Sequence, residues 1–180
     1  MDNLENKEAK AQKRMGFGMM VGMWVLVLAI MMYFFGTIFD HMQNPNQSVR
    51  AMQNAEGVKE VVLKRNRFGH YVSSGKINGQ RVEFMVDTGA SDVAVSESLA
   101  RSLGLERGAK QSLYTANGIS VGYQTRLDSV TVGNISLHNV RATIAPGMHD
   151  DQVLLGMAFL KNLEFTQRGN ELTIKQYPEL

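Results

Sequence analysis

The sequence predicts an all-β domain that closes into a barrel, carries one or two short helices and follows a single transmembrane helix. From residue 58 onward, short runs rich in Val, Ile, Thr and Phe alternate with turns that contain Gly and Asn. This pattern is typical of a closed fold built from many short strands. Residues 16–39, by contrast, include no charged side chain. A chain of 180 residues is therefore expected to hold one globular domain and an N-terminal appendage.

The uncharged stretch 16–39 is expected to be the transmembrane helix. With a rise of about 1.5 Å per residue, a helix of this length covers a hydrocarbon core of about 30 Å with some tilt. A cleaved signal peptide would have an apolar region of about 7–15 residues and a cleavage site of small residues. This run is longer and ends in Tyr-Phe-Phe-Gly-Thr-Ile-Phe at 33–39, so we favour an uncleaved anchor.

The charges on each side of this helix predict its orientation. Four basic residues precede it, whereas the first basic residue after it is Arg50. Because basic flanks stay in the cytoplasm, residues 1–15 are expected to be a cytoplasmic tail. The remainder would then lie across the membrane, in the periplasm if the membrane is the inner membrane of a bacterium. The four basic residues are Lys7, Lys10, Lys13 and Arg14.

The polar segment 40–57, rich in Asn, Gln and Ser, is expected to be a linker, and residues 58–180 form the predicted β domain. Strands are predicted at 58–63, 69–77, 82–86, 111–115, 119–127, 129–132, 136–144, 163–167 and 171–176, with further extended chain from 153. Short helices are predicted near 96–104, where Ser96 is the N-cap and Gly104 the end, and near 158–162.

Net charge and residue spacing exclude several classes of site. Residues 41–180 carry 15 Lys and Arg against 13 Asp and Glu, without the clustered basic face of a nucleic-acid binder. The basic cluster at 59–67 is interpreted as the solvent-facing side of an edge strand. The histidines at 41, 70, 138 and 149 are too widely spaced to form a metal site. We therefore expect no metal, no cofactor and no nucleic-acid partner.

The residues that carry chemistry lie at 85–92, Met-Val-Asp-Thr-Gly-Ala-Ser-Asp. An apolar strand ends at Asp87, and Thr-Gly-Ala then turns the chain tightly. A carboxylate at the end of a core strand is costly unless it is paired or hydrogen-bonded. Asp87 is therefore either the start of a structural turn or a working acid. The other acids lack this context, because Asp128 is followed by Ser-Val and residues 150–151 lie in a polar loop.

The flanks of this motif extend the pattern. A strand, an Asn-Gly turn at 78–79 and a second strand precede Asp87, the predicted helix 96–104 follows it, and Val-Leu-Leu-Gly occurs at 153–156. Over residues 58–177 the chain resembles the retropepsin-like aspartic proteases, and most closely their bacterial, membrane-anchored branch. The resemblance implies an aspartic endopeptidase with Asp87 as its catalytic residue and 58–180 as its protease domain.

Peptide hydrolysis by acids alone needs two carboxylates on one water, and this chain supplies one Asp-Thr-Gly. The second carboxylate is therefore expected from another copy, in a symmetric homodimer that cleaves extended peptide segments. By resemblance, Thr88 locks the two loops together, Gly89 allows close approach, and Ala90 and Ser91 stay small beside the substrate. Residues that pack behind the loop would be Leu154, Leu155 and Gly156. The charged residues that retroviral members place at positions 91 and 157 are absent here, so their ion pairs do not carry over.

The resemblance also implies a mobile flap over the two acids. It would be formed by the hairpin with Tyr114, Thr115, Ala116, Asn117, Gly118 and Ile119, whose Asn-Gly tip suits a tight turn. The alternative is an ordinary exposed hairpin. Two other functions remain open at this level. One is a non-catalytic, membrane-tethered dimer that binds peptides or proteins in the same cleft, and the other is a monomeric membrane adaptor.

Overall fold

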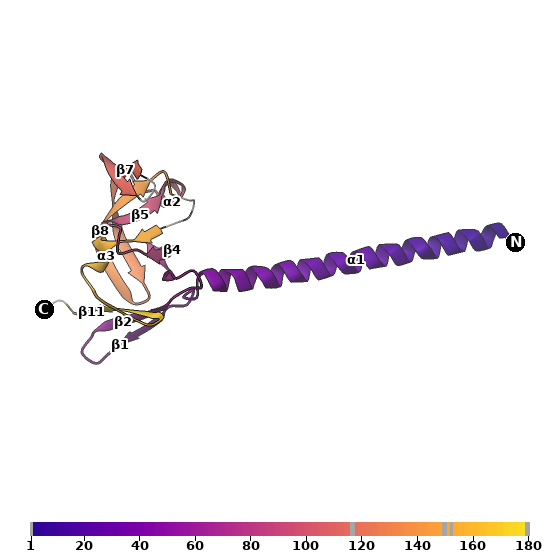
Figure 1. The fold of residues 1–180 in the computed structure, drawn as a ribbon, viewed down its shortest axis with the longest axis horizontal. Helices are drawn as coiled ribbons and strands as arrows, with labels where there is room; N and C mark the ends of the chain where they lie inside the picture. The colour runs from indigo at the N-terminus through magenta and orange to yellow at the C-terminus, as the bar shows by residue number, and fades with distance from the viewer. Residues whose placement is uncertain (1, 116–117, 149–150, 152, 179–180) are drawn as a thin grey trace. The chain divides into compact units, whose positions relative to one another are not determined.

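The computed structural model of the chain describes residues 2–115, 118–148, 151 and 153–178, and Figure 1 shows their fold. The chain divides into two compact units, residues 1–41 and 42–180. The flap tip Ala116–Asn117 lies outside the described residues.

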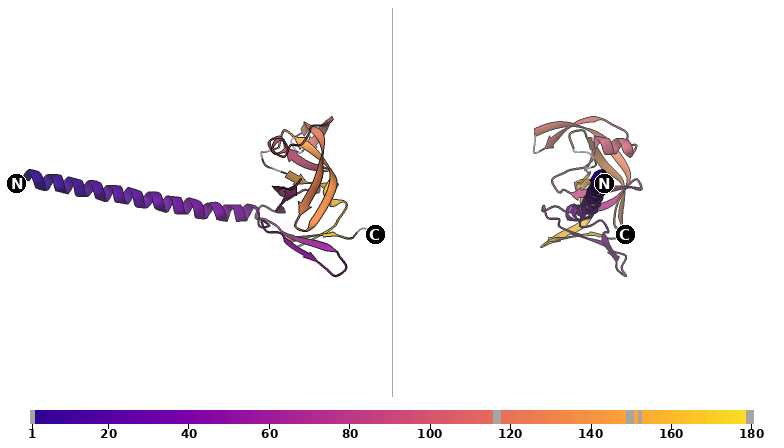
Figure 2. Two further views of the ribbon diagram at one scale, coloured as in Figure 1. Left: turned by 180° about the vertical axis from the view of Figure 1, so that it is seen from behind. Right: turned by 90° about the vertical axis from the view of Figure 1, so that its right-hand side faces the viewer.

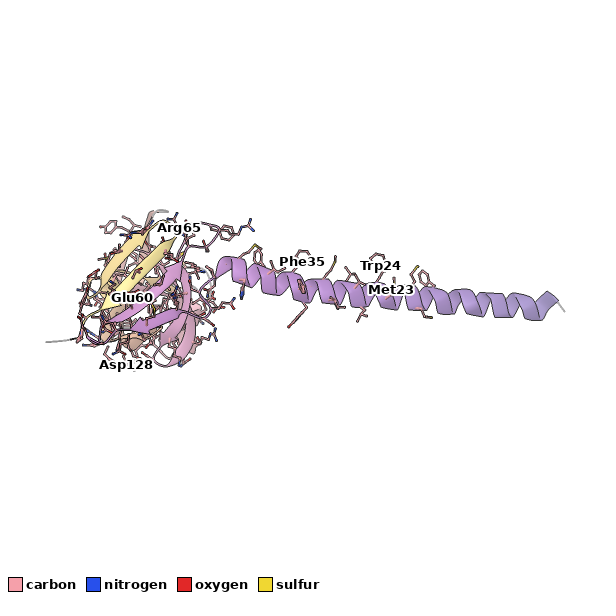
Figure 3. All side chains as sticks on the ribbon, turned by 90° about the horizontal axis from the view of Figure 1, so that it is seen from below. Met23, Trp24, Phe35, Glu60, Arg65 and Asp128 are labelled. Carbon is pink, nitrogen blue, oxygen red and sulfur yellow. The ribbon has the colours of Figure 1, made fainter. Side chains whose placement is uncertain are left out.

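The first unit is helical. Helix α1 spans Asp2–Gln43, and its part Gly16–Gln43 is long and apolar enough to cross a membrane. Large apolar side chains are exposed along this part, and Figure 3 shows Met23, Trp24 and Phe35 projecting away from the helix axis. A helix that is apolar on every side is typical of a membrane span or of a helix buried inside a protein.

The second unit is built mainly from a seven-stranded sheet in the described part of the chain. Its order is β3-β4-β9-β5-β8-β7-β6, and an additional pairing of β3 with β7 closes six of these strands into a ring. Two of its described pairs are parallel, β4 with β9 and β5 with β8. The strands are β3 (Val72–Ile77), β4 (Gln80–Val86), β5 (Val93–Ser96), β6 (Lys110–Thr115), β7 (Gly118–Val132), β8 (Ile135–Ala145) and β9 (Val153–Leu155).

A second, antiparallel sheet has the order β1-β2-β11-β10 among the described residues. In both views of Figure 2 its purple and yellow strands lie below the larger sheet. Strands β1 and β10 form its edges, and every residue of these two strands is exposed. The strands are β1 (Arg50–Gln53), β2 (Lys59–Lys64), β10 (Glu164–Arg168) and β11 (Glu171–Gln176).

Two short helices complete the β domain, α2 (Glu97–Ser102) and α3 (Met157–Leu160). Ser96 caps α2 as predicted, since its hydroxyl accepts a hydrogen bond from the Leu99 amide at 3.3 Å. A single hydrophobic core includes the fully buried Phe84, Leu155 and Phe159. The predicted all-β fold with short helices is confirmed, and the predicted Asn78-Gly79 turn has the expected positive φ angles of 49° and 81°.

The range 40–57, expected to be a linker, contains ordered structure: the end of α1, two buried asparagines and strand β1. The side chain of Asn46 bridges two strands. Its Nδ2 donates to the Lys64 carbonyl at 2.9 Å and the Val72 carbonyl at 2.6 Å, while its Oδ1 accepts from the Lys64 amide at 2.7 Å. Asn44 donates to Ser74 and to Glu83. These bonds fix residues 44–46 to the β domain.

Candidate active site

Asp87 follows the last residue of β4 and is half-buried. Strand β4 runs parallel to β9, and the Asp87 amide donates to the Leu155 carbonyl at 3.2 Å. The carboxylate is held locally, because its Oδ1 accepts from the Gly89 amide at 2.9 Å. The Asp87 carbonyl in turn accepts from the Ala90 amide at 3.2 Å. The tight turn therefore presents the carboxylate at the end of a core strand, as the sequence predicts.

The chain after Asp87 rests on the start of helix α3. The Met157 amide donates to the Ala90 carbonyl at 2.8 Å, and the Ala158 amide donates to the Ser91 carbonyl at 2.9 Å. Gly156 lies at the closest approach, since a Cβ there would be 2.5 Å from the Ala90 oxygen and closer still to that of Asp92. Only glycine fits at this position without moving a backbone.

The far end of the loop is fixed by a group we call the carboxylate cluster, made of Asp92, Arg141, Thr143 and Gln111. Asp92 Oδ1 pairs with Arg141 Nε at 2.5 Å, and its Oδ2 accepts from the Thr143 hydroxyl at 2.9 Å. Gln111 Nε2 donates to the same hydroxyl at 2.6 Å. Thr143 is buried, and the Asp92 side chain is 17% exposed. The cluster links the loop to β8 and to β6, the strand that leads to the predicted flap.

The β6–β7 hairpin carries two large apolar side chains in the open. Tyr114 is 86% exposed and Ile119 is 73% exposed, and they lie opposite each other across the hairpin. Both side chains are therefore accessible to a ligand that lies over the hairpin. Their positions agree with the flap hypothesis without testing it.

A hollow of about 260 Å³ opens beside Asp87 and is also lined by Thr88, Tyr71, Phe165 and Gln167. Larger hollows lie elsewhere, one of about 600 Å³ along β8 and α3. They are lined by none of the residues that the sequence proposes for the site. Thr88, Gly89 and Ser91 are exposed, whereas Ala90 is half-buried. Within the described residues, no group of three or more His, Cys, Asp and Glu side chains could hold a metal ion.

Residues 73–162 match the family model of the gag-polyprotein putative aspartyl protease. The chain is also 30% identical to a retropepsin-like aspartic protease from Rickettsia conorii, whose crystal structure it matches with a TM-score of 0.57 over 72% of this chain and 96% of the other. This chain belongs to the retropepsin-like aspartic proteases.

Two curated proteins match this retropepsin-like chain at similar levels. An uncharacterized protein of the cobV 5′ region of a Sinorhizobium species is 35% identical over 68% of this chain and 54% of its own length. An uncharacterized protein of Rickettsia prowazekii (strain Madrid E) is 31% identical over 67% of this chain and 52% of its own. The chain thus spans about half the length of the curated relatives that it matches.

The retropepsin-like fold brings together two of the three segments proposed from the sequence. Residues 87–91 lie against Leu155 and Gly156. Leu155 and Gly156 are both buried, and Leu154 is half-buried. The described strands of the flap hairpin connect to this region through the carboxylate cluster. Sequence reasoning gave Arg141, Thr143 and Gln111 no role. These residues meet Asp92 only in the folded chain, because the parallel pairing of β5 with β8 brings residue 93 opposite 142 and so places Asp92 beside Arg141 and Thr143.

Proposed function

We propose that the chain is a membrane-anchored aspartic endopeptidase that acts as a homodimer, with a water held between the Asp87 carboxylates of the two subunits. The observation that supports this most directly is the hydrogen-bonded placement of Asp87. The loop is fixed from behind by β9 and α3, while Thr88 and Gly89 stay exposed at its front. A loop built in this way can meet a second copy without rearranging.

The chemistry follows from two carboxylates that share one proton. The ionised carboxylate takes a proton from the water as its oxygen attacks the peptide carbonyl carbon. The protonated carboxylic acid gives its proton to the carbonyl oxygen, forming a neutral tetrahedral diol. When the diol collapses, the C–N bond breaks and the leaving nitrogen takes the proton held by one Asp87, while the other Asp87 carboxylate takes a hydroxyl proton from the diol. The products are a carboxylic acid and an amine, and the dyad again holds one shared proton. No step needs a metal or a cofactor.

The neighbours of Asp87 have supporting roles in this proposal. The exposed Thr88 hydroxyl would reach the partner's backbone, and Gly89 would allow the two loops to approach. The β6–β7 hairpin would close over an extended peptide, with the exposed Tyr114 and Ile119 as its apolar contacts. Extended substrates suit such a cleft because backbone groups on both sides can hydrogen-bond with them.

The proposed location follows from α1. Residues 16–39 would span the bilayer once, residues 1–15 would form the cytoplasmic tail, and 58–180 would form a periplasmic protease domain. Confining two copies to one bilayer raises their effective concentration. Gly18 and Gly22 have the spacing that lets transmembrane helices approach closely, which would add to this effect.

The first experiment compares Asp87→Asn with Asp128→Asn in the full-length protein, using an unfolded protein substrate at mildly acidic pH. Asp128 is exposed and serves as the matched control (labelled in Figure 3). Asp87→Asn should lower the rate at least about a thousandfold, and Asp128→Asn should leave it unchanged. A statine-type inhibitor should block the wild-type protein. Undiminished cleavage by Asp87→Asn would refute the enzymatic proposal, and substrate binding without cleavage by the wild type would favour the non-catalytic dimer.

The second experiment tests the shared site. Wild type and Asp87→Asn are reconstituted together in equal amounts at constant total protein. If both subunits must supply Asp87, only wild-type pairs are active and the rate falls to about a quarter. If each chain acts alone, the rate falls to half, and the homodimer proposal is wrong.

A further inference from the structure

Residues 61–82, which include the β2–β3 connection, carry an unusual charge pattern for a chain with nearly balanced charge. Between Glu60 and Glu83 there is no acidic residue, whereas five Lys and Arg occur there. Three of the five lie in residues 64–70, which we call the basic loop. Its Phe68 side chain is 55% exposed, which is costly for an aromatic ring in water. The five residues are Lys64, Arg65, Arg67, Lys76 and Arg81.

The basic loop is ordered by its own asparagine and attached to the last two residues of α1. Asn66 Oδ1 accepts from the amides of Phe68 at 3.0 Å and His70 at 2.9 Å. Asn66 Nδ2 donates to the Gln43 carbonyl at 2.9 Å, and the Arg67 guanidinium contacts the Met42 sulfur at 3.4 Å. Both partners belong to the same compact unit as the loop. The loop is thus a fixed extension of residues 42–43.

Chain connectivity limits how far this attachment can lie from a bilayer. Gln43 follows Phe39, the last apolar residue of the proposed span, by four positions. Four residues cover about 6 Å as helix and at most about 14 Å when extended. The headgroup layer is itself about 5–8 Å deep on each side of the hydrocarbon. Gln43 would therefore lie within about 14 Å of the hydrocarbon, so the basic loop bonded to it is within reach of the headgroups.

We propose that the basic loop binds the membrane surface, with the Phe68 ring in the interfacial layer and with Arg67 and Lys64 on the phosphates of anionic phospholipids. This inference rests on the proposed role of α1 as a membrane anchor. Aromatic rings are favoured at this depth, and each basic side chain near an anionic surface is attracted by it. Arg67 lies 5.2 Å from the Phe68 ring centre, so charge and ring are presented together.

The other charged groups around the loop fit this assignment. Arg65 is already engaged, because it donates to the Gly169 carbonyl at 2.7 Å and lies over the Tyr71 ring. Two acids, Glu83 and Asp151, line a hollow of about 400 Å³ that Phe68 also lines. Glu83 accepts a hydrogen bond from Asn44 at 2.5 Å. Lys64 and Arg67 are exposed and neither lines this hollow, so they are the two cations of the loop assigned to the phosphates.

The experiment uses the full-length protein in vesicles of phosphatidylcholine, with or without phosphatidylglycerol. Trp24 is the one tryptophan of the chain, so Phe68→Trp is made together with Trp24→Phe. Lipids brominated near the headgroup should then quench the fluorescence of the tryptophan introduced at position 68. The matched control is Tyr177→Trp in the same background, because Tyr177 is also 55% exposed. We expect strong quenching at position 68 and little at position 177.

Charge is tested in the same vesicles. Phosphatidylglycerol should increase quenching at position 68. Arg67→Gln should lower the ratio of membrane-bound loop to released loop about fivefold. Arg101→Gln, which removes an equally positive but remote charge, should not. Equal quenching at positions 68 and 177, or quenching that does not respond to phosphatidylglycerol, would overturn the proposal. Failure of the anchor itself gives a different result, since Trp24 of the wild type would then escape quenching by lipids brominated in the acyl chain.

Discussion

The substitution Gly156→Ala tests whether the loop of Asp87 depends on its contact with α3. The added Cβ would lie 2.5 Å from the Ala90 oxygen, whereas an ordinary contact begins at 3.4 Å. The two nearest atoms, the Ala90 and Asp92 oxygens, belong to backbone carbonyl groups and cannot rotate away as a side chain would. The loop must therefore move away from α3 by at least about 0.9 Å at the Ala90 oxygen, and by more at the Asp92 oxygen, which would be closer still.

The size of the effect follows from the hydrogen bonds that such a movement breaks. Bonds of 2.8 Å and 2.9 Å join the amides of Met157 and Ala158 to the loop, and about 0.9 Å more takes both beyond bonding distance. Two lost bonds cost about 1 kcal/mol each, and overpacking adds about 1–3 kcal/mol. We expect the free energy of unfolding to fall by about 3–5 kcal/mol. The displaced Asp87 should also lower peptidase activity by about a hundredfold.

Stability is measured by pulse proteolysis in urea on the full-length protein in detergent. Tryptophan fluorescence would report on α1, which contains Trp24, rather than on the β domain. The matched control is Gly147→Ala, whose Cβ would make only an ordinary contact of 3.5 Å with the Ser120 hydroxyl. It should change stability by less than about 0.5 kcal/mol. If Gly156→Ala were as stable and as active as this control, the close approach of loop and α3 would have no energetic role.

Three further predictions concern groups away from the Asp87 turn. Thr143→Val should lower the free energy of unfolding in urea by about 2 kcal/mol, because it leaves the half-buried Asp92 and Gln111 without their buried hydroxyl partner. Arg141→Gln, at a side chain that is 60% exposed, should lower it by less than about 1 kcal/mol. Equal losses for the two variants would contradict a special role for the buried hydroxyl. Asn46→Ala should lower the free energy of unfolding by about 3 kcal/mol, since three hydrogen bonds join the Asn46 side chain to two strands. Wild-type stability of this variant would show that residues 44–46 are a free linker. The pKa of Tyr177 is raised above its ordinary value of 10.0, chiefly by its hydrogen bond to the Glu164 carboxylate. The stability that this bond contributes is present below pH 10 and is lost as pH rises through the raised pKa. Glu164→Gln should therefore lower the pKa of Tyr177 in an NMR titration of the ring.

The parts of the fold that sequence reasoning predicted correctly are those set by local chemistry. The Asn78-Gly79 turn needs two positive φ angles, which these residue types supply at low cost. Ser96 caps α2 because a serine hydroxyl can accept a bond from an amide three residues later. The turn at Asp87 follows from a short apolar strand that ends in Thr-Gly-Ala. Each of these features depends on a short run of consecutive residues.

The parts that it missed depend on distant partners. Strand β1 is exposed along its whole length and carries no apolar alternation, so only its pairing with β2 makes it a strand. Strand β5, four residues between the Asp87 loop and α2, forms because β8 and β9 lie on its two sides. The basic cluster was interpreted as the outer side of an edge strand, which was wrong. Strand β2 lies inside its sheet between β1 and β11, and these neighbours cannot be read from residues 59–67.

The described hydrogen bonds between the Asp87 loop and the rest of the chain involve β9, α3 and the carboxylate cluster, and this bears on how the proposed dimer would gain its activity. Strand β9 and helix α3 hold the loop from behind, and the carboxylate cluster holds its far end. Hydrogen bonds within one chain thus offset the entropy cost of ordering the loop before a second copy binds. Docking a second copy then has to order little beyond the exposed Thr88 and Gly89. In the proposed anchored dimer, confinement to one bilayer would also raise the effective concentration, so a small contact area would suffice to hold two such loops together.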